Sequence, residues 1–215
     1  GDITPAYCVL PDSSIEYMLS FNKDMRFIYL VRNPIELAWS HISFLTEGSL
    51  SLCDVQKYLW VQNYSYYLRI IKKYLKYVAP ENLFLGFYED ILFHPNRFLA
   101  AVQEFLDVPV EDIGSKPQLT GGYKGINTEY AVYLAQRNIR KIEEMASIFG
   151  GYAQFWLDVA SELCQTDTTI QSDETFLSTP FATNDLWSSR WECSGAKDFQ
   201  SGPLSSMSCV NKLIP

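Results

Sequence analysis

An arginine and a serine eight residues apart, Arg32 and Ser40, have the side chains and the spacing to hold an anion. The arginine directly follows an apolar run, and its guanidinium offers a planar fork of N–H donors that suits a phosphate or a sulfate. The serine falls in the second turn of an expected helix that starts just after Arg32, and a helix N-terminus also favours an anion. If the loop folds Arg32 back along this helix, both side chains can reach one phosphate.

The residues of this segment also have ordinary interpretations that spacing alone leaves open. An arginine at a strand end is commonly a surface residue or an ion-pair partner, and a serine inside a helix often has no specific role. Glu36, three residues after Asn33, fits a capping box better than a catalytic role. His41 either faces a pocket or packs within an aromatic-rich helix.

Two other polar clusters carry weaker signals. Tyr88 and Glu89 end a second apolar run, and the carboxyl ends of parallel strands form one rim where ligands bind. We therefore expect them on the same rim as Arg32, although acids at a helix start often only complement the helix dipole. The lysines Lys72, Lys73 and Lys76 are predicted to form a solvated helix face.

The elements that must position these residues follow from apolar periodicity. Residues 25–31 and 82–88 are continuous apolar runs, typical of strands buried on both faces. Asn33 as N-cap and Pro34 as the first helical residue predict a clean helix start after the first strand. Apolar residues at helical spacing predict further helices over 13–22, 54–78, 94–108, 129–149 and 153–164.

This order of elements predicts an α/β fold with a parallel sheet. Two strands alone make an unconvincing sheet, so further strands are expected either upstream of residue 1 or as short runs within the loops. We expect the α/β domain to span residues 1–164. From 165 to 215 the composition shifts to Ser, Thr, Asp and Gly but keeps several aromatics, so this extension is predicted to be partly docked or disordered.

Composition narrows the classes of partner. The 215 residues carry a formal charge of −8, which argues against nucleic acid because phosphate backbones need clustered Lys and Arg. Two histidines, and five cysteines without a C-x-x-C pair, argue against a metal site. Since no apolar run reaches about 18 residues, we expect no membrane span.

The cysteines give a weak indication of the compartment. An odd number of widely spaced cysteines fits reduced thiols in a cytosolic-type compartment, with one or two disulfides left open. We expect a cytoplasmic location, or the secretory lumen if the source is eukaryotic. The chain starts with Gly and lacks a signal-peptide pattern. We therefore expect a fragment or a processed product.

The segment RFIYLVRNPIELAWSHISF, residues 26–44, resembles the 3'-phosphate-binding segment of sulfotransferases that use 3'-phosphoadenosine 5'-phosphosulfate (PAPS). That family's pattern is an apolar strand, then Arg-Asn-Pro or Arg-Asp-Pro, then a helix with a serine eight residues after the arginine. The resemblance implies that Arg32 and Ser40 bind the 3'-phosphate of PAPS or of the product, adenosine 3',5'-bisphosphate. It also implies a P-loop-like three-layer fold, a central parallel sheet flanked by helices, incomplete here at its N-terminus.

Three further stretches extend the resemblance. FYEDI, residues 87–91, is similar to the family's second recurring block, in which the tyrosine approaches the adenine, and this implies such a role for Tyr88. GDITPAY, residues 1–7, resembles the loop before the 3'-phosphate strand in bacterial and carbohydrate-type members. GYKGIN, residues 122–127, loosely resembles a later cofactor loop and adds Lys124 and Gly125 as cofactor-binding candidates.

The chain departs from the family pattern at the sulfur end of the cofactor. The family's first strand and its P-loop-like phosphosulfate-binding loop with a lysine should precede this segment and are not among these residues, and without them sulfuryl transfer should be severely impaired. Some relatives have a Lys or His base in the first loop. In this chain Ile3 and Thr4 occupy those places. The catalytic residue is therefore unknown, with Asp2 and His41 as weak candidates.

These patterns leave two functions of different classes open. The first is a PAPS-dependent sulfotransferase that moves a sulfuryl group to a hydroxyl or amine, with no metal. The second is a non-catalytic module that keeps the fold for binding or for a structural role. A glycosyltransferase is disfavoured because the chain has no Asp-x-Asp motif. The acceptor, whether a small molecule or a carbohydrate, and the oligomeric state stay open.

Overall fold

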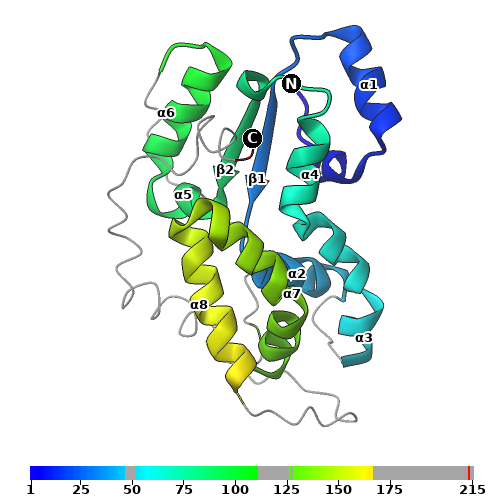
Figure 1. Ribbon diagram of the computed structural model, residues 1–215, viewed down its shortest axis with the longest axis vertical. Coiled ribbons are helices and arrows are strands. Elements are labelled where there is room, and N and C mark those ends of the chain that lie inside the picture. Colours follow the sequence, from blue (N-terminus) through cyan, green and yellow to red (C-terminus); the bar gives the residue numbers. More distant parts are fainter. Residues whose placement is uncertain (47–51, 111–125, 127, 167–212, 214–215) are drawn as a thin grey trace. The chain divides into compact units, whose positions relative to one another are not determined.

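The computed structural model of the chain describes residues 1–46, 52–110, 126, 128–166 and 213 (Figure 1). These residues form two compact units. The first unit contains residues 1–31, 66–110 and 213, and the second contains residues 32–46, 52–65, 126 and 128–166. The chain thus passes from the first unit to the second between Val31 and Arg32.

The first unit is built on two parallel strands, β1 (Phe27–Val31) and β2 (Leu83–Phe87). Their register pairs Phe27 with Leu83 and Val31 with Phe87, so the two strands end level at their carboxyl ends. The prediction of an α/β fold with a parallel sheet is confirmed. These are the only strands in the part of the chain that the structure describes, and whether the fold is P-loop-like stays a prediction.

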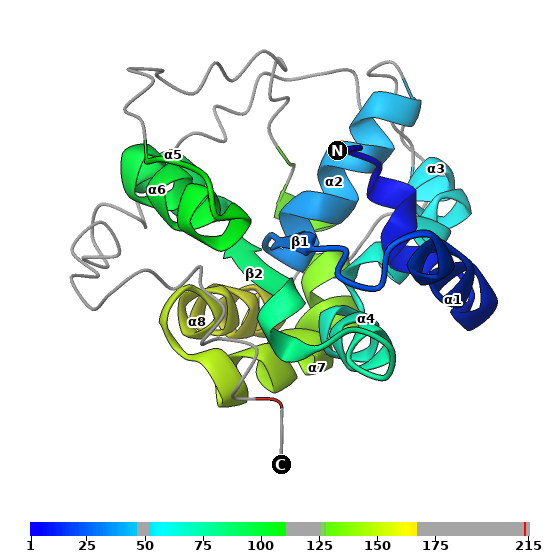
Figure 2. The same cartoon turned by 90° about the horizontal axis from the view of Figure 1, so that it is seen from above.

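Helices cover both faces of this strand pair, and Figures 1 and 2 show α4 and α6 on opposite sides of it. Aromatic side chains make the contacts: Tyr67 and Tyr74 of α4 (Tyr67–Tyr74) meet the rings of Tyr29 and Phe27. On the other face, Phe84 meets the rings of Phe98 and Phe105 of α6 (Pro95–Leu106). Because strand side chains alternate between faces, Phe27 and Tyr29 of β1 pack on α4, while Phe84 of β2 packs on α6.

A close approach explains the glycine of β2. A Cβ on Gly86 would lie 2.6 Å from Leu30 Cδ2 and 2.9 Å from the ring of Phe98. The missing side chain therefore lets α6 pack down onto the strand pair. The short α5 (Tyr88–Phe93) joins β2 to α6.

The N-terminal segment of the first unit is tied to α4 by polar contacts. It contains η1 (Pro5–Val9) and α1 (Asp12–Phe21), joined by a bend. The Lys73 ammonium donates hydrogen bonds to the backbone oxygens of Cys8 and Leu10, at 3.1 and 2.6 Å. The Tyr74 hydroxyl donates to the backbone oxygen of Tyr7 at 2.6 Å. The prediction that Lys73 belongs to a solvated face is therefore wrong, because its amine caps carbonyls that the bend leaves unpaired.

Lys73→Met should lower the free energy of unfolding by about 1–3 kcal/mol, because it removes charge-assisted hydrogen bonds and leaves two carbonyls without their donor. Urea unfolding followed by circular dichroism measures this loss. Lys72→Met is the matched control, since Lys72 is exposed on the same helix turn. Equal effects of the two substitutions would show that the contacts of Lys73 add nothing to stability.

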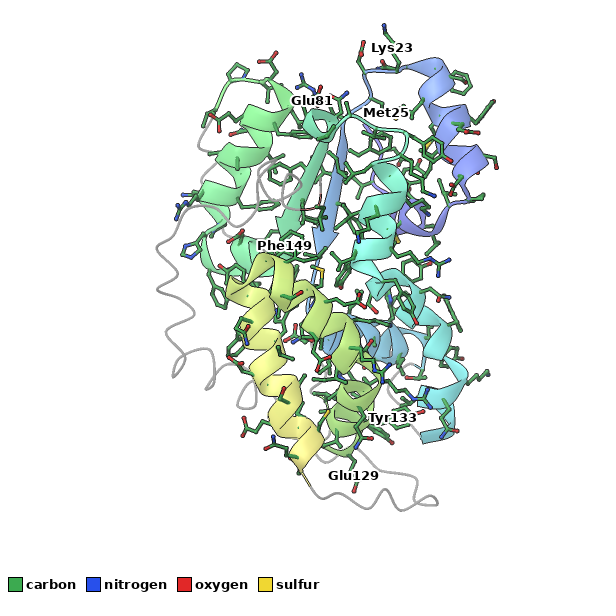
Figure 3. The ribbon with its side chains drawn as sticks, viewed as in Figure 1. Lys23, Met25, Glu81, Glu129, Tyr133 and Phe149 are labelled. Carbon is green, nitrogen blue, oxygen red and sulfur yellow. The ribbon has the colours of Figure 1, made fainter. Side chains whose placement is uncertain are left out.

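The second unit is helical. Its elements are α2 (Pro34–Leu45), α3 (Leu52–Lys57), η2 (Leu59–Ser65), α7 (Thr128–Phe149) and α8 (Gly151–Gln165). The long helices α7 and α8 lie side by side, and Gly150 and Gly151, both with positive φ, turn the chain between them (Figure 1). Figure 3 labels Glu129 and Tyr133 near the start of α7 and Phe149 at its end. Alanines on the two helices allow a close approach, at Ala131, Ala135, Ala146, Ala153 and Ala160.

Aromatic contacts fix α2 within this unit. Trp39, only 4% exposed, stacks on Tyr130 of α7 with ring centroids 5.6 Å apart. On another side of α2, His41 meets the ring of Tyr64 of η2 edge-on at 5.4 Å. The helix that follows Arg32 is thus held by α7 and by η2.

One predicted element is wrong: the helix expected over residues 54–78 is broken into α3, η2 and α4. The apolar stripe used for that prediction lacks a member between Leu59 and Leu68. The break between η2 and α4 falls in this gap, where Ser65 and Tyr66 also mark the passage from the second unit back to the first. Periodicity on either side of a gap does not reveal that the two halves pack in different units.

Candidate functional site

The start of α2 forms as the sequence predicts. Asn33, fully buried, accepts a hydrogen bond from the backbone N–H of Ile35 at 2.9 Å through its side-chain oxygen, and Pro34 is the first helical residue. The cap satisfies one of the N–H groups that a helix start leaves unpaired. The side-chain nitrogen of Asn33 is buried and has no hydrogen-bond partner among the described residues. This buried donor next to Arg32 is a polar feature that the cap alone does not explain.

Arg32 folds back onto this helix and pairs with Glu36. Its Nε donates to Glu36 Oε2 at 3.1 Å, and the two side chains are only 18% and 13% exposed. The expectation that Glu36 completes a capping box is thus replaced by an ion pair with the arginine. Burial raises the pKa of Glu36, while the adjacent Arg32 cation acts in the opposite direction.

Ser40 lies one helical turn beyond Glu36, so the two side chains share a face of α2. Ser43 is three residues further on the same face, and its hydroxyl is buried without a hydrogen-bond partner among the described residues. The contact with Glu36 directs the Arg32 side chain along this face. Arg32 thus pairs with Glu36, and Ser40 lies one turn further along the helix. We call these three residues of the second unit the Arg32 stripe.

His41, a weak catalytic candidate, packs against Tyr64 instead of standing free in solvent. Burial lowers the pKa of His41, and the Arg32 cation lowers it further. Its Nδ1 is buried and has no hydrogen-bond partner among the described residues. The imidazole is therefore neutral at pH 7, and its covered nitrogen makes a poor contact for a substrate.

Asp2, the other weak catalytic candidate, is exposed near the chain start in the first unit. Its carboxylate accepts hydrogen bonds from the Tyr7 and Thr4 hydroxyls, and the Tyr7 hydrogen bond is the main reason that its pKa lies below the ordinary value. A carboxylate with a lowered pKa is a weaker base. Its environment therefore gives no support to a catalytic role.

The remaining predicted residues belong to the first unit or fall outside the described residues. Tyr88 begins α5, directly after β2, and belongs to the first unit, where it is half-buried. Glu89 and Asp90, buried in the first turn of α5, match the prediction of acids at a helix start. Lys124 and Gly125 lie outside the described residues.

Sequence reasoning missed two polar residues of the second unit. Glu36 was assigned to capping, although the spacing Arg-x3-Glu-x3-Ser already places all three side chains in line. Lys141 of α7 donates to Ser65 Oγ at 3.2 Å and to Asn138 Oδ1 at 3.1 Å, and burial lowers its pKa to about 8. No local signal marks Lys141, since its partner Ser65 is distant in the sequence.

The described residues hold no group of three or more His, Cys, Asp or Glu side chains placed to bind a metal ion. In the same part of the chain, no helix combines the length and the apolar character that crossing a membrane requires.

Comparison with known proteins gives one match. A family model described as the sulfotransferase domain matches residues 13–121, just over half of the chain. The matched range includes the Arg32–Ser40 segment, both strands and Tyr88. No curated protein and no solved structure matches the chain.

Proposed function

The chain belongs to the sulfotransferase domain family, and from this premise we propose that it binds the adenosine bisphosphate end of PAPS and serves sulfuryl transfer to a hydroxyl or amine. Arg32 and Ser40 hold the 3'-phosphate, and Tyr88 faces the adenine. PAPS supplies an activated sulfuryl group, and no metal takes part. The residues that act on the acceptor are not assigned.

The observation that carries this proposal is the placement of Arg32. Glu36 folds the guanidinium back along α2, toward the face on which Ser40 lies one turn further on. A guanidinium and a hydroxyl on one face of a helix start match the charge and the hydrogen-bond needs of a phosphate. The buried side-chain nitrogen of Asn33 offers a further donor beside them.

Recognition of the 3'-phosphate determines which nucleotide binds, and it takes no direct part in the transfer of the sulfuryl group. A site built to bind a phosphate rejects a ligand without it, because its buried donors are then left unpaired. Arg32 and Ser40 would thus select PAPS over other adenine nucleotides. By holding the adenosine end they fix the donor's position, which is how enzymes of group transfer gain most of their rate.

Calorimetric titration of the protein with adenosine 3',5'-bisphosphate and with adenosine 5'-monophosphate tests the proposal. We expect the bisphosphate to bind at least about a hundredfold more tightly, since charged hydrogen bonds to a phosphate are worth about 1.5–3 kcal/mol each. Equal affinities, or no binding of either nucleotide, would contradict it.

The non-catalytic module is the second candidate, and the Arg32–Glu36 pair favours it. An arginine that already has a carboxylate partner is the ordinary structural interpretation of that residue. A folded protein that transfers no sulfuryl group from PAPS to a panel of phenols, sugars and amines, and whose Arg32 contributes to stability and not to bisphosphate affinity, would support this candidate. Turnover of any acceptor would exclude it.

A further inference from the structure

The carboxylate of Glu36 is close to the place where the proposed anion must bind. Glu36 Oε2 accepts from Arg32 Nε at 3.1 Å, and both side chains are mostly buried. A phosphate held by the same guanidinium and by Ser40, on the same face of α2, would therefore lie near this carboxylate. Two negative groups brought together in a partly buried site repel each other strongly.

We propose, on the premise of the proposed function, that Glu36 is a proton-linked positioning residue: it aims Arg32 at the anion and takes up a proton when the anion binds. In the free protein, ionised Glu36 holds the guanidinium along α2. When the phosphate arrives, the protonated carboxyl no longer repels it, and its carbonyl oxygen still accepts from Arg32 Nε. The positive charge of Arg32 is then no longer balanced by Glu36 and attracts the phosphate alone.

The surroundings of Glu36 are suited to this uptake. Burial raises the pKa of Glu36 and so favours its protonation, while Arg32 opposes that effect. The elements packed against α2 are η2 and α7. Among the described charged and titratable groups on these elements, which include Tyr64, Glu129, Arg137 and Lys141, none acts on Glu36 as Arg32 does. His41 also senses the Arg32 charge and is the second group that an anion would perturb.

The direction of the pH dependence follows from linkage. Binding that raises a pKa takes up protons between the free and the bound pKa values, so affinity rises as pH falls through that window. In this window the affinity changes by up to about tenfold per pH unit for one proton. Above the bound pKa, Glu36 is ionised in both the free and the bound protein and no longer makes the affinity depend on pH.

The test is calorimetry of adenosine 3',5'-bisphosphate binding between pH 5 and 8, in buffers of different ionisation heat, which counts the protons taken up. We expect the wild-type protein to take up more protons than Glu36→Gln, by as much as one per site. Glu36→Gln should bind at least as tightly as wild type at pH 8, because an amide keeps the contact with Arg32 without the charge. Glu36→Ala should bind more weakly at every pH, because the arginine loses its support.

The comparison of variants separates Glu36 from other groups that titrate. The ligand's own phosphate and His41 titrate in both proteins, so the proton count of Glu36→Gln contains their uptake, and the excess in wild type measures what the Glu36 carboxyl adds. Glu144→Gln, exposed on α7, is the matched control and should take up as many protons as wild type. If Glu36→Gln does not fold, the carboxyl carbon shift of Glu36 in wild type, followed by NMR with and without ligand, gives the same answer.

The possible failures are distinguishable. Binding that depends on Arg32 but shows equal proton uptake in wild type and Glu36→Gln, or an unchanged carboxyl shift, overturns this inference and leaves the proposed function standing. Absence of binding, or binding that ignores Arg32, overturns both. A merely structural Glu36 would alter stability without altering the proton count.

Discussion

Replacement of Arg32 by alanine is expected to abolish most of the affinity for adenosine 3',5'-bisphosphate. Truncating one partner of a buried, hydrogen-bonded charge pair costs about 2–5 kcal/mol, or about 30- to 5,000-fold in affinity. Arg32→Lys should recover only part of it, because an ammonium lacks the planar fork that binds a phosphate and Glu36 together. Titration calorimetry at constant pH measures both losses.

Arg32→Ala also leaves the buried Glu36 carboxylate without its cation, so affinity must be separated from stability. The double variant Arg32→Ala/Glu36→Gln removes both charges and should fold better than Arg32→Ala while still failing to bind. Arg140→Ala is the matched control, since Arg140 is exposed on α7 of the same unit. Retention of wild-type affinity in the double variant would show that Arg32 is structural.

The local signals that the sequence carries for α2 are strong because they act between near neighbours. Asn33 caps the helix through a contact two residues away, and Pro34 fixes the first helical backbone angle. The continuous apolar runs likewise identify β1 and β2, because a strand packed between helices needs apolar residues on both faces. These features predict the helix start and the strand pair without any tertiary contact.

The misjudged features depend on residues that are distant in the chain or on competition between partners. Lys73 looks solvated within its helix, but it binds the backbone of residues 8 and 10. The break before α4 follows from packing in two units, which periodicity does not encode. Glu36 had two possible partners, the backbone N–H of the cap residue and the guanidinium of Arg32. The structure shows that it pairs with Arg32.

The sequence therefore predicts which residues form the candidate site, but not how Glu36 interacts with Arg32. The spacing of Arg32 and Ser40 predicts an anion site, and the structure pairs Arg32 with Glu36, which lies one turn before Ser40 on α2. The role of Glu36 between them depends on how deeply the pair is buried, which a sequence does not state. Burial raises the pKa of the Glu36 carboxyl, and the proposed proton uptake depends on this effect.

The second large effect is expected from the aromatic residue that holds this helix in place. Trp39→Ala removes a side chain that is 4% exposed and stacks on Tyr130 of α7. Large-to-small substitution of a buried tryptophan costs about 3–5 kcal/mol, a large share of the about 5–15 kcal/mol that stabilises a typical protein. We expect a fall in Tm of roughly 10 °C, measured by thermal unfolding with circular dichroism.

The matched control for Trp39 is Trp60, a tryptophan of the same unit that is 52% exposed. Trp60→Ala should cost less than about 1 kcal/mol, because its ring is already half in water. Trp39→Phe should lie between the two, since a smaller ring keeps part of the stack on Tyr130.

Because Trp39 fixes the helix that carries Ser40 and follows Arg32, Trp39→Ala should also weaken adenosine 3',5'-bisphosphate binding below its unfolding temperature. Equal destabilisation by Trp39→Ala and Trp60→Ala would mean that α2 is not anchored on α7, and the Arg32 stripe would then lack its support.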